Sequence, residues 1–335
     1  MTSRLLVAVT RAVPETGLDL LREHVDIRIW DKDTPPNPDE LDTLLEGVDG
    51  MLALLSERID GDLLDRHPSV RFVSNLAVGY DNIDVDACTS RGVIVTNTPG
   101  VLTKATAEFA FALMVATARR IPEAVDYVRD GNWVTWGPKL LLGQQILGAT
   151  LGIVGFGRIG QGMAKMASGF GMRVLVNNRR QDPKLAARFD VTFVDFIDLL
   201  KESDFVSLHV ALTPETHHLI STREFGLMKK TAVLINAARG PVVDTDALVT
   251  ALNDGEIFAA GLDVTDPEPL PADHPLVSMP NAVIVPHIAS ATVQTRNAMS
   301  SLAARNIVEI VSGRRPAAVV NLAAYDHKAA SDQGA

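Results

Sequence analysis

Three side chains in the second half of the sequence could together bind an anion and exchange a proton. Arg239, Glu268 and His287 each stand shortly after an apolar run with the character of a buried strand. Parallel sheets bind ligands at the carboxyl ends of their strands, so we expect the three to share one site. A guanidinium binds a carboxylate, an imidazole exchanges a proton, and a carboxylate favours the charged imidazole. Taken singly, His287 is better explained as a structural histidine and Glu268 as a surface charge, so only the set favours catalysis.

A glycine-rich turn predicts where a dinucleotide binds. Residues 155–160 read GFGRIG, after the apolar run Leu151–Val154 and before a helical stretch, Gln161–Phe170. In such a motif Gly155 allows the tight turn, Gly157 admits a pyrophosphate close to the backbone, and Gly160 lets helix and strand pack closely. The helix N-terminus then offers N–H groups to the phosphates. The alternative, a turn that is merely tight, does not explain the matching strand and helix.

The residues after the next strand indicate which nicotinamide cofactor is used. An acidic side chain there would bind the ribose 2′-hydroxyl of NAD, but the sequence is Asn177-Asn178-Arg179-Arg180. No carboxylate repels a 2′-phosphate and two guanidiniums can bind it, with Arg158 adding a third positive charge. NADP(H) is therefore favoured. NAD(H) stays possible if Arg179 and Arg180 are only solvated loop charges.

Composition excludes several classes of function. The 335 residues include 31 Lys and Arg against 41 Asp and Glu, a net charge of −10. This disfavours a nucleic-acid-binding surface, so anionic ligands need local arginines. The single cysteine, Cys88, excludes an intrachain disulfide and thiol-ligated structural zinc, and we expect no metal. No apolar run approaches the roughly 18 residues of a membrane span, so we expect a cytoplasmic protein without a membrane partner.

The elements that must position these residues form two alternating series of apolar runs and helical patterns. The first series has predicted strands at Leu5–Val9, Val25–Trp30, Gly50–Leu55, Phe72–Asn75 and Val93–Asn97. The second has predicted strands at Leu151–Val154, Arg173–Asn177, Val191–Val194, Phe205–His209, Ala232–Asn236, Ala259–Asp263 and Ala282–Pro286. A long helix, Lys104–Ile121, separates them and stops near Pro122, and a last helix runs from about Thr292 to Ser312. The fold class is therefore α/β, with two doubly wound parallel-sheet domains, the second a Rossmann dinucleotide-binding domain.

Together these motifs resemble the D-isomer-specific 2-hydroxyacid dehydrogenases, and among them the glyoxylate/hydroxypyruvate reductases. The resemblance covers nearly the whole chain. It rests on GYDNID at residues 79–84, the glycine motif, LTPET at 212–216 and the three catalytic segments, in family order. It implies a flavodoxin-like substrate-binding domain of residues 1–100 plus 291–325 and an NAD(P)-binding domain of residues 101–290, with the active site in the cleft between them. Residues 326–335 are expected to be a disordered tail.

The resemblance also implies roles for individual residues. Arg239 would bind the substrate carboxylate, protonated His287 would give a proton to the carbonyl oxygen, and Glu268 would hold the imidazole. Further substrate contacts are expected from Leu55, from backbone N–H groups near Val78 and Gly79, and from Trp136. In similar reductases the tryptophan at the place of Trp136 reaches into a partner subunit's active site, which implies a homodimer. The alternative is a core or interface aromatic without substrate contact.

The implied cofactor contacts are spread along the second domain. They are Thr106, Gly155, Phe156, Gly157, Arg158, Ile159, Gly160, Asn178, Arg179, Arg180, Val210, Ala211, Thr216, Ala237, Ala238, Asp263, His287 and Ala289. We therefore expect an NADPH-preferring reductase of glyoxylate and hydroxypyruvate that forms D-2-hydroxy acids. The alternatives are a dehydrogenase for another keto acid, such as 2-ketogluconate, and a nucleotide-sensing binding protein like the corepressors that share this fold.

Overall fold

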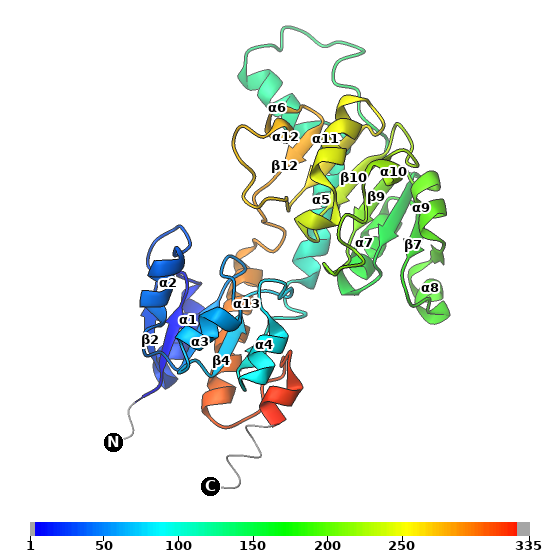
Figure 1. Cartoon of the computed structure of the whole chain (residues 1–335). Coiled ribbons are helices and arrows are strands. Elements are labelled where there is room, and N and C mark those ends of the chain that lie inside the picture. The colour runs from blue at the N-terminus through cyan, green and yellow to red at the C-terminus, as the bar shows by residue number, and fades with distance from the viewer. Residues whose placement is uncertain (1–3, 327–335) are drawn as a thin grey trace. The chain divides into compact units, whose positions relative to one another are not determined.

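Two parallel β-sheets organise the chain in the computed structural model, which describes residues 4–326 (Figure 1). One compact unit comprises the described residues up to Leu102 and those from Thr292 onward, and the other comprises Thr103–Ala291. The tail expected at residues 326–335 lies, except for its first residue, outside the described residues. Which unit binds substrate and which binds cofactor stays a prediction.

The first unit is built on a five-stranded sheet in the order β2-β1-β3-β4-β5, with every strand pair parallel. Its strands are β1 (Leu6–Val9), β2 (Asp26–Ile29), β3 (Gly50–Ala53), β4 (Phe72–Asn75) and β5 (Ile94–Thr96). Its helices are α1 (Glu15–His24), α2 (Pro38–Leu45), α3 (Gly61–Arg66), α4 (Val85–Ser90) and α13 (Val293–Val311). This strand order is the flavodoxin-like one.

The second unit has a seven-stranded parallel sheet in the order β12-β11-β10-β9-β6-β7-β8. Its strands are β6 (Thr150–Val154), β7 (Arg173–Asn177), β8 (Val191–Phe193), β9 (Phe205–Leu208), β10 (Val233–Asn236), β11 (Ala259–Leu262) and β12 (Ala282–Ile284). Its helices are α5 (Thr103–Ala118), α6 (Ile121–Arg129), α7 (Arg158–Gly169), α8 (Pro183–Phe189), α9 (Phe196–Glu202), α10 (Thr222–Phe225), α11 (Thr245–Asn253) and α12 (Pro275–Ser278), with a 3₁₀ turn at Gly240–Val242. The direction of strand addition reverses between β6 and β9, as in a Rossmann fold, so the predicted fold class is confirmed.

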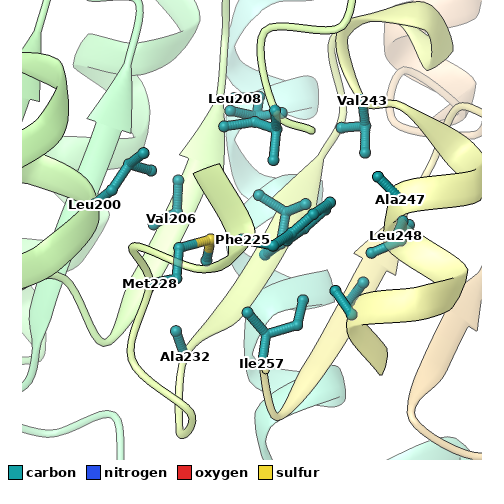
Figure 2. Packing of buried hydrophobic residues seen from close by; sticks show 14 of the residues in the cluster. Leu200, Val206, Leu208, Phe225, Met228, Ala232, Val243, Ala247, Leu248 and Ile257 are labelled. Carbon is teal, nitrogen blue, oxygen red and sulfur yellow. The ribbon is translucent and has the colours of Figure 1, made fainter. Parts of the chain in front are cut away.

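Alternate residues of the central strands pack on opposite faces of this second sheet. Phe205 packs with the side chains of α5 and α7, whereas its neighbour Val206 packs in the cluster on the other face. In that cluster Phe225 is fully buried among residues from β9, α11 and the intervening loops (Figure 2). Strands buried on both faces are rigid supports, so the loops at their carboxyl ends begin from fixed positions.

Two helices differ from the sequence prediction. The long helix ends at Ala118, and a second one, α6, begins at Ile121 after Arg120, which has a left-handed φ of 53°. Pro122 therefore opens a helix instead of stopping one, since a first-turn residue needs no backbone N–H. The short helix α4 was not predicted; Asp84 caps it by accepting a hydrogen bond of 2.8 Å from the Ala87 N–H. Among the described residues, no helix combines the length and apolar character needed to cross a bilayer.

Candidate active site

The three candidate catalytic residues follow three neighbouring strands of the second sheet. Arg239 comes after β10, Glu268 after β11 and His287 after β12, and β11 pairs with both of its neighbours in parallel. Parallel strands bring their carboxyl ends to one edge of a sheet. The fold therefore gathers the three side chains on the same edge of one unit.

His287 and Glu268 form a direct hydrogen bond. The imidazole Nδ1 donates to Glu268 Oε1 at 2.6 Å, since an ionised carboxylate only accepts. Glu268 Oε2 also receives the Thr265 N–H at 3.4 Å. The His287 side chain keeps 31% of its surface exposed. With Nδ1 committed to the carboxylate, Nε2 is the ring atom that can exchange a proton with a ligand.

The turn that carries His287 is held by a buried carboxylate. Asp263, 1% exposed at the end of β11, accepts hydrogen bonds from the N–H groups of Ile288 at 2.6 Å and Ala289 at 3.1 Å. The His287 N–H donates to the Asp263 carbonyl oxygen at 2.9 Å, and His287 has a left-handed φ of 53°. Burial raises the pKa of Asp263, and the two N–H groups counteract this increase. The predicted cofactor residue Asp263 thus positions the candidate proton donor.

Arg239 is half-buried and held against the end of its own strand. Its Nη1 donates to the Ala238 carbonyl oxygen at 2.8 Å, and its own carbonyl accepts from Asn236 Nδ2 at 2.8 Å. Asn236 Oδ1 in turn accepts the Ala238 N–H at 3.0 Å. These bonds fix the segment after β10 that contains Ala237 and Ala238, two of the predicted cofactor residues.

The glycine-rich turn has the shape that a dinucleotide pyrophosphate requires. Gly155 has a left-handed φ of 94°, and a Cβ on Gly160 would collide with the Gly155 carbonyl oxygen, so neither position tolerates a side chain. Gly157 is the N-cap of the twelve-residue helix α7, and a Cβ built there meets nothing within 4 Å. The open space beside a helix N-terminus fits a phosphate group. Phe156, Arg158 and Ile159 lie in this same turn.

Asn178 connects the end of β7 to the glycine turn. Its Oδ1 accepts the Phe156 N–H at 3.1 Å and its Nδ2 donates to the Arg180 carbonyl oxygen at 2.7 Å. Arg158, Arg179 and Arg180 are all exposed. The positive charge of Arg179 also reaches Glu215, whose pKa is lowered first by the Thr213 hydroxyl and, more weakly, by this arginine.

The loop after β9, on the other side of the strand-order reversal, contains Val210, Ala211 and Thr216. Thr216 Oγ1 donates to the Ala211 carbonyl oxygen at 2.6 Å and accepts the Thr213 N–H at 2.8 Å, which closes the loop. Thr106 lies on α5 and is buried. The structure thus places the predicted cofactor residues at the ends of β6, β7, β9, β10, β11 and β12 and on α5, all within the second unit.

The predicted substrate contacts divide between the two units. Leu55, Val78 and Gly79 lie in the first unit, after β3 and β4. Trp136 lies in the second unit between α6 and β6, with 80% of its surface exposed. A substrate role for these four residues stays a prediction.

His209, which follows β9 beside the glycine turn, was not among the predicted site residues. Its Nε2 bonds to Ser207 Oγ at 2.9 Å, while its Nδ1 is shielded from solvent and has no partner among the described residues. Burial lowers the pKa of His209 to about 4. A histidine at the end of an apolar strand carries no sequence signal for this environment. Among the described residues no group of three or more His, Cys, Asp or Glu side chains could hold a metal ion.

Comparison with known proteins agrees with the architecture of this site. Residues 111–289 match the family model described as D-isomer specific 2-hydroxyacid dehydrogenase, NAD binding domain. Over 319 residues the chain is 48% identical to a glyoxylate reductase of Thermococcus gammatolerans, covering 94% of this chain and 95% of that protein.

Solved structures share the fold along almost the whole chain. The TT0316 protein from Thermus thermophilus has a TM-score of 0.89 and 46% identity, covering 94% of this chain and 100% of that one. An NADPH-dependent glyoxylate/hydroxypyruvate reductase from Sinorhizobium meliloti, in complex with NADP and malonate, has a TM-score of 0.83 and 33% identity, covering 95% and 97%.

Proposed function

Because the chain belongs to the D-isomer specific 2-hydroxyacid dehydrogenases, a family of oxidoreductases, we propose that it reduces small 2-keto acids to D-2-hydroxy acids, with glyoxylate and hydroxypyruvate as substrates. The observation that carries the proposal is the 2.6 Å hydrogen bond between His287 and Glu268, on the same sheet edge as Arg239. A proton donor beside an anion-binding guanidinium is what reduction of a keto acid requires.

The three residues have distinct roles in the proposed reaction. The Arg239 guanidinium binds the substrate carboxylate and polarises the adjacent carbonyl. His287 donates the proton on Nε2 to the carbonyl oxygen, and Glu268 holds the ring through Nδ1. The bound nicotinamide supplies the hydride. In the opposite direction neutral His287 accepts the proton from the hydroxyl group.

A panel of keto acids tests this function. Steady-state rates are measured with glyoxylate, hydroxypyruvate, pyruvate and 2-ketogluconate, each with NADPH and with NADH. Glyoxylate and hydroxypyruvate are expected to have the highest kcat/KM. A higher kcat/KM for 2-ketogluconate than for glyoxylate and hydroxypyruvate would make 2-ketogluconate the assigned substrate instead. Tight NAD(H) binding with no turnover of any acid would refute the enzyme and favour a nucleotide-sensing role.

We also propose that Arg179 and Arg180 make NADPH the preferred cofactor. Both side chains are exposed at the end of β7, the position where a carboxylate would select NAD. Neither forms a salt bridge within residues 4–326. Hydrogen bonds to a charged group contribute about 1.5–3 kcal/mol, so removing both arginines should raise the KM for NADPH by at least about tenfold. The KM for NADH should change little.

Arg173 provides the matched control for that experiment. It is an exposed arginine at the opposite end of the same strand, bonded to Glu202 at 2.8 Å. The R173A variant should keep the wild-type ratio of kcat/KM values for the two cofactors, whereas R179A/R180A should not. Equal losses with NADPH and NADH in R179A/R180A would contradict the assignment.

A homodimer is the proposed assembly. Between α6 and β6 the chain exposes 64% of Trp133, 90% of Val134 and 80% of Trp136. Apolar exposure of this kind marks an interaction surface. Light scattering should give twice the mass of the chain, and W136A should weaken association or raise the KM for the keto acid. A monomeric wild-type enzyme with full activity would refute the proposal.

A further inference from the structure

The chain leaving β4 makes a turn whose carbonyl groups are all bonded to the first unit. The Ala77 carbonyl oxygen accepts the Thr98 N–H at 2.8 Å. The Val78 carbonyl oxygen accepts from Asn97 Nδ2 at 2.8 Å, and the Gly79 carbonyl oxygen accepts from Asn75 Nδ2 at 2.8 Å. Three successive carbonyl groups therefore point toward the body of the unit.

The planarity of the peptide bond fixes the opposite side of this turn. In a trans peptide the N–H of one residue points away from the carbonyl of the residue before it. The N–H groups of Val78, Gly79 and Tyr80 therefore point away from the donors that bind the three carbonyl groups. Within residues 4–326 the hydrogen bonds give none of these three N–H groups an acceptor. Val78 and Gly79 are half-buried and Tyr80 is exposed.

We propose that Asn75 and Asn97 are positioning residues that hold the N–H groups of Val78 and Gly79 outward to bind the carboxylate of a 2-keto acid. Successive backbone N–H groups that face the same way form an anion-binding site without a charged side chain. The proposal rests on the keto-acid reductase function proposed above and adds two residues that act through the backbone of the turn.

Both asparagines are fixed in place. Asn97 donates its backbone N–H to the Ala318 carbonyl oxygen at 3.2 Å, and its own carbonyl oxygen accepts from Asn306 Nδ2 of α13 at 3.0 Å. Asn75 is fully buried at the end of β4. Its Oδ1 is shielded from solvent and has no partner among the described residues. An unpaired buried amide oxygen lowers stability, so packing alone does not explain an asparagine at this position.

Isosteric substitution separates positioning from packing. N97D keeps the shape of the side chain but places a carboxylate oxygen, which cannot donate, against the Val78 carbonyl. N97D and N75A should raise the KM for glyoxylate by about tenfold or more, while the KM for NADPH stays within about twofold. N97A provides a second variant in case the introduced charge prevents folding.

Asn321 supplies a control for loss of stability. It lies in the same unit, accepts the Val95 N–H at 2.8 Å and donates to the Val93 carbonyl oxygen at 2.8 Å, away from the turn. N321A should lower the melting temperature and leave the KM for glyoxylate unchanged. An equal rise in KM for N321A, or wild-type KM values for N97D and N75A, would overturn the proposal.

A binding measurement separates failure of this inference from failure of the proposed function. Oxamate, a keto-acid isostere, is titrated into the NADPH-loaded protein that carries isotope-labelled valine and glycine. The amide signals of Val78 and Gly79 should shift in the wild type and not in N97D. Unmoved signals in an enzyme that turns over glyoxylate would refute the inference alone. Absence of keto-acid turnover in the wild type would instead refute the function.

Discussion

Replacing His209 should remove a large part of the acid sensitivity of the second unit. The ring bonds to Ser207 through Nε2, and its shielded Nδ1 has no partner among the described residues, so a charged imidazole is poorly solvated there. Burial accordingly lowers the pKa of His209 from 6.5 to about 4. The folded protein therefore takes up this proton only at a much lower pH than the unfolded chain.

The size of the effect follows from these pKa values. Each pKa unit corresponds to about 1.4 kcal/mol, so the difference between 6.5 and about 4 amounts to about 3 kcal/mol. This stability is fully present above pH 6.5, where His209 is unprotonated in both the folded and the unfolded protein. It is lost as the pH falls toward 4, because the unfolded chain then binds the proton and the folded protein does not. The residue as a whole is only half-buried, so about 3 kcal/mol is the upper end of the expected loss.

Urea unfolding of the wild type and of H209Q between about pH 7 and about pH 4 measures this quantity. Glutamine can keep the bond to Ser207 but does not titrate, and every other group titrates in both proteins. The wild type should therefore lose about 2–3 kcal/mol more than H209Q over this range. Equal losses of unfolding free energy in the wild type and H209Q would refute the reasoning. An NMR titration in which the His209 imidazole titrates near its ordinary pKa would refute it as well.

Three further substitutions have defined outcomes. H287Q should lower kcat for glyoxylate by about 10²–10⁴-fold with little change in the KM for NADPH, as steady-state kinetics would show, because it removes the proton donor. E268Q keeps a hydrogen-bonding group of the same size and should lower kcat by less than H287Q; an equal or larger loss would contradict the positioning role. G240A places a Cβ against the Thr265 carbonyl oxygen and should destabilise the protein by about 1–3 kcal/mol in urea unfolding. An unchanged unfolding midpoint would show that the backbone shifts enough to accommodate the methyl group.

The sequence predicted most of the fold because buried parallel strands are short continuous apolar runs. All twelve predicted strands occur close to their expected places. The errors come from weaker local signals. Pro122 reads equally well as the end of one helix or the first turn of another, and only the left-handed Arg120 decides between them. Helix α4 has six residues, too few for a clear periodic pattern.

The candidate site was predictable in its residue types but not in its connections. The family motifs identify His287 and Glu268, yet the bonds from Asp263 to the turn after β12 depend on backbone angles that no sequence pattern reports. The same holds for Asn97, whose side chain bonds to a carbonyl 19 residues away in the chain. Such contacts form between loops of different strands, so they become visible only in the folded unit.

The division of the first unit between the two ends of the chain affects the order in which the protein folds during synthesis. The last strand of its sheet is β5, but helix α13, which packs on the sheet, is encoded after the whole second unit. This helix is bonded to the early part of the chain: Ser300 donates to the Pro14 carbonyl oxygen, and the Ala303 carbonyl oxygen accepts from Ser74. At about 5–20 residues per second, roughly 10–40 s separate the emergence of β5 from that of α13. The second unit is contiguous and can close its core within that interval. Until α13 is translated, the part of the sheet that this helix covers, which includes β3 and β4, stays exposed on the nascent chain.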